Sequence, residues 1–180
     1  MSGLSRYGLR VLATGRWPLP ADRDRPLPPL PGFTASSFNP LVAEAAERCL
    51  RSRFGAAPAA PAPTRTALLL ASCSGDLATA RAIDTAAEAA DRRMPPLLFF
   101  QSNPNAVLGH IAARWQLTGP VVAISTAVAA APGVLPPDAL DLAALLLADG
   151  DADQVLVIAA EQTERTEHLD HAVAHLVTVA

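Results

Sequence analysis

The sequence predicts an α/β fold in which a mixed, mostly parallel sheet of five strands is covered by helices. Short apolar segments typical of strands alternate along the chain with segments that carry helix start and stop residues. One strand segment, "TALLLAS" at residues 66–72, is apolar almost throughout, which is typical of a sheet covered on both faces. Hydrophobic residues make up 51% of the 180 residues and aromatic residues only 4%, so we expect mainly small side chains between the layers.

The first third of the chain predicts one strand and one helix joined by proline-rich sequence. The strand is expected at residues 9–13, and proline-rich connections are expected at residues 18–32 and 56–64. A helix is expected between Asn39, which can cap it, and Gly55, which can end it in a left-handed conformation.

The middle of the chain predicts the second strand, at residues 66–72, followed by two helices. The first helix opens at Asp76 and is expected to reach residue 93. Residues 94–102, "MPPLLFFQS", predict an extended stretch. The second helix lies between an Asn-Pro start at residues 103–104 and a Gly-Pro stop at residues 119–120.

The last third predicts three strands, at residues 121–126, 154–160 and 172–180. Residues 127–137 contain Pro132, Pro136 and Pro137, which disfavour an unbroken helix after the first of these strands. A helix is expected from Asp138 to a stop at Gly150. We expect all 180 residues to form a single domain.

Composition argues against several classes of partner and cofactor. The net charge is −3, and the 14 basic residues form no stripe, so we expect no nucleic-acid partner. No apolar run approaches the roughly 20 residues that span a bilayer, and the N-terminus lacks an apolar signal core. We therefore expect a cytoplasmic protein without a membrane partner. Cys49 and Cys73 form no metal-ligand pattern, and no metal or other cofactor is expected.

Two motifs carry a resemblance to a known family. The first contains Asn105, a Gly-His-Ile-Ala segment at residues 109–112, a Leu-x-Gly-Pro turn at residues 117–120, and a strand that ends in Thr-Ala at residues 126–127. The second contains Gly150, Ala152 and Asp153 in a turn, followed by a strand that ends at Glu161. Both motifs resemble the β-ketoacyl synthases of the thiolase superfamily, loosely before residue 64 and more specifically over residues 99–162. The resemblance implies a thiolase-like half, the N-terminal one, and a structural role for Glu161.

The sequence departs from this family at the residue on which its chemistry depends. The family's nucleophilic cysteine falls on Val128, whose side chain has neither a proton to lose nor a lone pair to donate. The two catalytic histidines of the family belong to a second half that this sequence does not match. The resemblance therefore implies a catalytically silent subunit with no catalytic residue of its own.

The resemblance also implies partners: an active β-ketoacyl synthase in a heterodimer, and an acyl carrier protein. In such dimers the strand before the nucleophile pairs across a two-fold axis, and the loop before the Gly-His-Ile-Ala helix reaches the partner's acyl tunnel. A chain-length factor pairs in this way without making bonds, in fatty-acid, polyketide or aryl polyene synthesis. The resulting interface and tunnel candidates are Phe99, Phe100, Gln101, Ser102, Asn103, Val121, Val122, Ala123, Ile124 and Ser125. A partner is also expected to cover an exposed helix face with Leu142, Leu145 and Leu146.

Two other functions remain open on the sequence. Cys73 is an alternative nucleophile for an acyl-thioester hydrolase or transferase, although we favour a packing role for it and for Cys49. A homodimeric scaffold that binds carrier proteins is the other alternative. His110 is interpreted as a packing residue. The spacing of His168, His171 and His175 is compatible with a metal site, which we do not favour.

Overall fold

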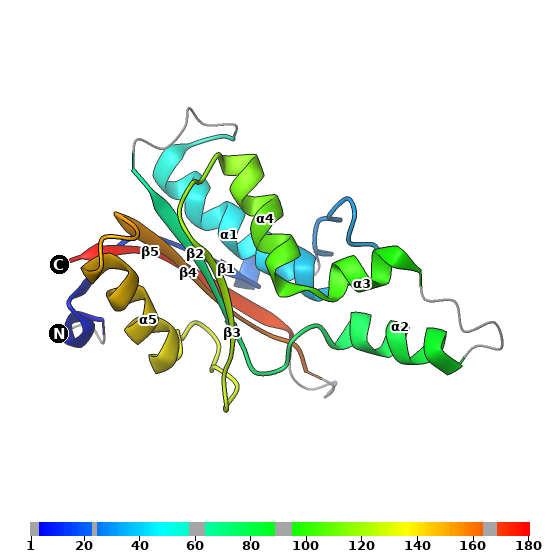
Figure 1. Ribbon diagram of the computed structural model, residues 1–180. Coiled ribbons are helices and arrows are strands. Elements are labelled where there is room, and N and C mark those ends of the chain that lie inside the picture. Colours follow the sequence, from blue (N-terminus) through cyan, green and yellow to red (C-terminus); the bar gives the residue numbers. More distant parts are fainter. Residues whose placement is uncertain (1–3, 23–24, 58–63, 89–94, 164–168) are drawn as a thin grey trace.

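The computed structural model describes residues 4–22, 25–57, 64–88, 95–163 and 169–180. A sheet forms the middle layer, with α1 and α4 on one face and α5 on the other (Figure 1). Two further helices, α2 and α3, project beyond the end of the sheet. The strands and helices are β1 (Leu9–Trp17), α1 (Phe38–Phe54), β2 (Thr66–Ser72), α2 (Leu77–Glu88), α3 (Pro96–Ser102), α4 (Pro104–Trp115), β3 (Val121–Ser125), α5 (Pro137–Ala148), β4 (Gln154–Glu161) and β5 (His171–Val179).

The sheet has five strands in the order β1-β5-β4-β2-β3. β2 pairs in parallel with both β3 and β4, whereas β5 is antiparallel to its two neighbours, β4 and β1. Four strands therefore share one direction, which confirms the mixed, mostly parallel sheet. Because β3 is the last strand in this order, one of its edges has no partner strand within the described residues.

Successive side chains of the central strands point to opposite faces of the sheet, so they contribute to two hydrophobic cores, one on each face. Leu68 and Leu70 of β2 face α1 and α4, whereas Leu69 faces α5. Every residue of β2 and β4 is buried, as expected for strands covered on both faces. The layers approach closely: a Cβ at Gly15 of β1 would collide with main-chain atoms of α1 at Ala45 and Cys49.

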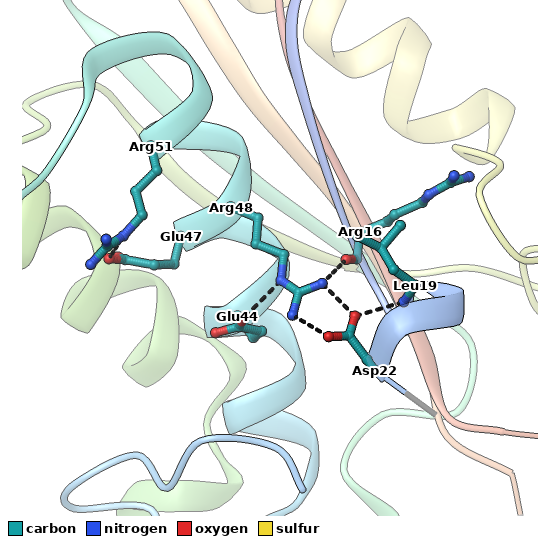
Figure 2. A network of polar contacts seen from close by, with 7 residues as sticks. All are labelled: Arg16, Leu19, Asp22, Glu44, Glu47, Arg48 and Arg51. Atoms are coloured by element: carbon teal, nitrogen blue, oxygen red, sulfur yellow. Dashed lines mark hydrogen bonds and ion pairs between the residues drawn. The ribbon is translucent and has the colours of Figure 1, made fainter. Parts of the chain in front are cut away.

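The proline-rich segment after β1 is held to α1 by a charged network (Figure 2). Arg48 of α1 forms a two-pronged ion pair with Asp22, with distances of 2.6 and 3.0 Å, and also donates to the carbonyl oxygen of Arg16. The Leu19 N–H donates to the same Asp22 carboxylate at 2.8 Å. The hydrogen bond from Arg48 is the main reason that the pKa of Asp22 falls to about 2. These contacts fix the segment that carries the chain from β1 to α1.

Three expected elements differ in the structure. β1 extends to Trp17, well past residue 13, because residues 14–17 continue to pair with β5. The prediction of an extended stretch at residues 94–102 is wrong, since Pro96 begins a helix, α3, and a proline fits the first turn of a helix as well as an extended segment. α4 ends at Trp115, before the expected Gly-Pro stop, because Gln116 adopts a left-handed conformation with φ of 53°.

The helix starts are partly as predicted. The Asp76 side chain accepts the Thr79 N–H at 3.0 Å and Asn103 accepts the Asn105 N–H at 2.9 Å, which confirms both as caps. Asn39 is not a cap: α1 begins at Phe38, and Asn39 is buried. Gly55 ends α1 as expected, but with φ of 84° and ψ of −148° it does not adopt the expected left-handed helical conformation. Residues 89–94, with the expected end of α2, and residues 58–63 of the second proline-rich connection lie outside the described residues.

Candidate functional site

Val128, where the resemblance places the family's nucleophilic cysteine, lies just beyond β3 in a segment without regular helix. The Thr126 N–H donates to the Ser72 carbonyl at 3.1 Å, and the Thr126 hydroxyl donates to the Val128 carbonyl at 3.0 Å. The Val128 side chain is 76% exposed. No helix begins at Val128, since the next one, α5, starts at Pro137. The expected interruption of the helix is confirmed, and the positive end of a helix dipole is absent from this position.

Glu161, at the end of β4, ties together the two loops that surround this position. Its side chain is only 4% exposed. The carboxylate accepts the main-chain N–H groups of Cys73 at 3.0 Å, Ser74 at 2.9 Å and Ala130 at 3.1 Å. The first two groups follow β2 and the third follows β3, so one buried acid links the ends of three parallel strands. This arrangement agrees with a structural role for Glu161.

The two cysteines differ sharply in their surroundings. Cys49 is fully buried on α1, and burial is the main cause that raises the pKa of its thiol to about 12, so its packing role is confirmed. Cys73 is exposed, and the packing interpretation for it is wrong. Its position after β2 directs it out of the core, while its N–H is held by Glu161. No described histidine forms a hydrogen bond with the Cys73 thiol.

A pocket of about 570 Å³ opens between the loop after β3, the end of β1 and the start of β5. His171 lines it, and His171 Nε2 lies 3.0 Å from the Ala130 carbonyl oxygen. A carbonyl oxygen only accepts, so Nε2 can donate a hydrogen bond to it when that nitrogen is protonated. The described lining residues, including Arg16 and Gln162, contain no cysteine or serine. The pocket can hold a small molecule but brings no such nucleophile to it.

The two expected interface segments meet at the free edge of the sheet. The end of α3, with Gln101 and Ser102, and the last residues of β3, with Ala123, Ile124 and Ser125, line a common pocket of about 130 Å³. Phe99 and Phe100 of α3 are 77% and 51% exposed. Of the remaining candidates, Asn103 caps α4, Val121 is 37% exposed, and Val122 packs partly against the core under α5.

Sequence reasoning missed the polar group behind this pocket. Asn39 and Gln101 are each only 1% exposed, and the Asn39 amide donates to the Gln101 carbonyl oxygen and to Asp76. The Asn-Pro pair at residues 39–40 is a local pattern that predicts a helix start. It gives no indication that the Asn39 side chain bonds to Asp76, 37 positions away, or to Gln101, 62 positions away.

The outer face of α5 is less apolar than expected. Leu145 is 54% exposed and Leu142 is half-buried, but Leu146 is only 9% exposed. The expectation that Leu146 would be exposed is wrong, because its position on α5 turns it toward the sheet. A smaller apolar surface is therefore available to a partner on this side.

The histidines form no metal site among the described residues, where no group of three or more potential ligands is present. His168 lies outside those residues. His110 packs edge-on against Phe33 at a centroid distance of 6.2 Å, which confirms its packing role. His175 is partly buried on β5, which lowers the pKa of its ring. Among the described helices, none combines the length and apolar character needed to cross a membrane.

Residues 34–177 match the family model described as "Beta-ketoacyl synthase, N-terminal domain". No curated protein sequence matches the chain. Solved structures share the fold, including one described as "The ishigamide ketosynthase/chain length factor", with a TM-score of 0.63 and 18% identity over 84% of this chain and 46% of that chain.

Two further solved complexes are similar. One is a ketosynthase (ApeO) in complex with its chain length factor (ApeC) from Xenorhabdus doucetiae, with a TM-score of 0.62 and 18% identity over 96% of this chain and 79% of that chain. The other is the AntDE:AntF complex of a type II polyketide acyl carrier protein with its ketosynthase, with a TM-score of 0.59 and 14% identity over 82% of this chain and 48% of that chain. The chain thus spans about half the length of the first and third matched chains. At these identities the likeness establishes a thiolase-like fold.

Proposed function

This chain belongs to the β-ketoacyl synthase family, in its N-terminal domain, and on that basis we propose that it is a catalytically silent, chain-length-factor-like subunit. In this role it pairs with an active β-ketoacyl synthase and shapes the acyl tunnel of that partner. The pathway would be fatty-acid, polyketide or aryl polyene synthesis, with an acyl carrier protein delivering the substrates.

The observation that carries the proposal is the valine at position 128. Acyl transfer in this family needs a thiolate, and a helix N-terminus helps to generate one by lowering the thiol pKa. Val128 has no sulfur, and it lies in an irregular segment nine positions before the first residue of α5. Both requirements are missing at the same place.

The free edge of the sheet supports a partner. β3 is the last of the described strands in the sheet order and has exposed or half-buried side chains throughout, unlike the fully buried β2 beside it. An open edge strand presents unpaired main-chain groups and readily accepts another strand. Phe99 and Phe100 lie on α3, the helix whose last residues line the pocket beside β3, and both side chains are more than half exposed. Such a surface suits burial in a partner's tunnel or interface.

Co-expression with an active β-ketoacyl synthase and an acyl carrier protein from the same genome tests the proposal. We expect a stable complex on size-exclusion chromatography, and about tenfold weaker association for Phe99→Ser, which removes an anchor without disturbing the core. Val11→Ser is the matched control, because Val11 is 41% exposed on β1, at the opposite edge of the sheet. Absence of any complex, with carrier protein present, would contradict the proposal.

The exposed Cys73 supports a second candidate, acyl-thioester hydrolysis or transfer. Incubation with an acyl-pantetheine thioester followed by mass spectrometry separates the two candidates. A covalent acyl adduct on Cys73 that Cys73→Ser abolishes favours the enzyme, whereas its absence favours the silent subunit. Light scattering of the isolated chain tests the third arrangement, a homodimeric scaffold, which predicts twice the mass of the chain.

A further inference from the structure

The pocket at the end of β3 contains two buried polar atoms without a partner. Among the described residues, neither Asn39 Oδ1 nor Gln101 Nε2 forms a hydrogen bond, although both atoms are buried. Both residues line the pocket of about 130 Å³. Buried polar atoms are almost always satisfied, so an unpaired acceptor and an unpaired donor beside one pocket indicate a missing group.

The chemical identity of the two unpaired atoms follows from their neighbours. The other atom of the Gln101 amide accepts the Ala35 N–H at 2.9 Å, so it must be oxygen. The other atom of the Asn39 side-chain amide lies 3.2 Å from the Asp76 carboxylate and 3.1 Å from the main-chain carbonyl oxygen of Gln101. Both of these groups only accept hydrogen bonds, so this atom must be nitrogen. The residues that line the pocket therefore hold one free donor, in Gln101, and one free acceptor, in Asn39.

The pocket opens beside the free edge of the sheet. Ala123 packs partly against the core under α1 and α4, so its side chain lies on the pocket side of β3, whereas Val122 and Ile124 face α5. A strand added to β3 would run about 4.8 Å from it and place alternate side chains on this same face. The small side chain of Ala123 leaves room for one of them to enter.

From this geometry we propose that the pocket receives an Asn or Gln side chain from a partner strand added to β3. A carboxamide carries an acceptor and a donor on adjacent atoms, so one group can accept from Gln101 and donate to Asn39. The inference rests on the proposed pairing of this chain through β3, and it adds the residue type that the partner must supply.

A second copy of this chain fits the pocket poorly. β3 reads Val-Val-Ala-Ile-Ser, so Ser125 is its only polar side chain. In a two-fold antiparallel pairing centred on Ala123, Ser125 of the second copy lies opposite Val121, at the far end of the strand from the pocket. The Asn39 and Gln101 atoms would stay unpaired, which favours a different chain as the partner.

Two strand peptides test the inference on the full chain. They have seven residues and differ only at the central one, Asn against Leu, which have nearly the same shape. We expect the Asn peptide to bind about tenfold more tightly than the Leu peptide, which is the gain in affinity that one net hydrogen bond provides. Binding should also move the Gln101 side-chain amide resonance in NMR spectra, and the Leu peptide should leave it unchanged.

Three variants make the result specific. Gln101→Glu keeps the oxygen that accepts the Ala35 N–H but removes the free donor, so the Asn preference should disappear. Ala123→Leu fills the pocket and should have the same effect if Gln101→Glu fails to fold. Val11→Leu enlarges an exposed side chain on β1, at the opposite edge of the sheet, and should preserve the preference.

Each outcome has a distinct meaning. Equal binding of the two peptides, or an Asn preference that survives both pocket variants, overturns the inference but leaves pairing through β3 intact. If neither peptide binds, the inference is also overturned, and the proposed function is then decided by complex formation with the ketosynthase.

Discussion

Replacing Glu161 by alanine tests whether this single acid holds the loops around position 128. The substitution leaves the N–H groups of Cys73, Ser74 and Ala130 without their acceptor. A hydrogen bond to a charged group contributes roughly 1.5–3 kcal/mol when its partner stays buried. The three donors are only partly buried and share two oxygen atoms, so water replaces part of the loss. We expect a net destabilisation of about 3 kcal/mol.

This magnitude is large against the total stability of a domain, which is typically about 5–15 kcal/mol. For a chain of this size, about 3 kcal/mol lowers the melting temperature by roughly 6–12 °C. Glu161→Gln keeps one carbonyl oxygen as an acceptor, so we expect about half the loss. Urea and thermal unfolding followed by circular dichroism measure both variants.

Asp141→Ala is the matched control, because Asp141 is an exposed acid on α5. It should change the free energy of unfolding by no more than about 0.5 kcal/mol. If Glu161→Ala unfolds at the same urea concentration as this control, the carboxylate does not hold the loops, and the structural role of Glu161 is wrong.

Three further measurements follow from burial. In the native protein Ellman's reagent at pH 8 should modify Cys73 but not Cys49, whose thiol pKa is raised to about 12, and urea should expose both. Burial lowers the pKa of His175, so the unfolded chain binds its proton first as the pH falls below about 6.5, and stability declines from pH 7.5 to pH 5. His175→Leu should reduce that decline in urea midpoint, and an unchanged decline would refute the assignment. Gly15→Ala should destabilise by about 3 kcal/mol, because the new Cβ collides with α1, whereas Gly109→Ala, which meets nothing within 4 Å, should be neutral or stabilising.

The strands could be predicted from the sequence because their signal is local. Residues 66–72 and 154–160 are apolar runs of strand length, and the structure buries every residue of both strands. The free edge at β3 could not be read in the same way. Val121 and its neighbours are as apolar as β2, and only the strand order leaves them half exposed.

The prediction for residues 94–102 was wrong because proline is common both in extended segments and in the first turn of a helix. The same residue type fixes φ for an extended segment and for the first turn of a helix, so the Pro-Pro pair at residues 95–96 fits both. The structure uses Pro95 in an extended conformation and Pro96 as the first residue of α3. Local sequence also gave no sign that Asn39 would bond across 62 positions to Gln101.

The loop after β3 has neither a cysteine at position 128 nor a helix that begins there. A helix that began at position 128 would contain Pro132, Pro136 and Pro137 in its interior, and each would remove a hydrogen bond and clash with the preceding turn. The chain instead leaves residues 126–136 without regular helix and starts α5 at Pro137, where a proline is tolerated. A cysteine at position 128 would thus gain nothing from a helix N-terminus. An activated thiol at this position would thus require both a cysteine and a helix start. Among the described strands β3 has a neighbour on one side only, and Phe99 and Phe100 of α3 are exposed, which supports the association proposed above.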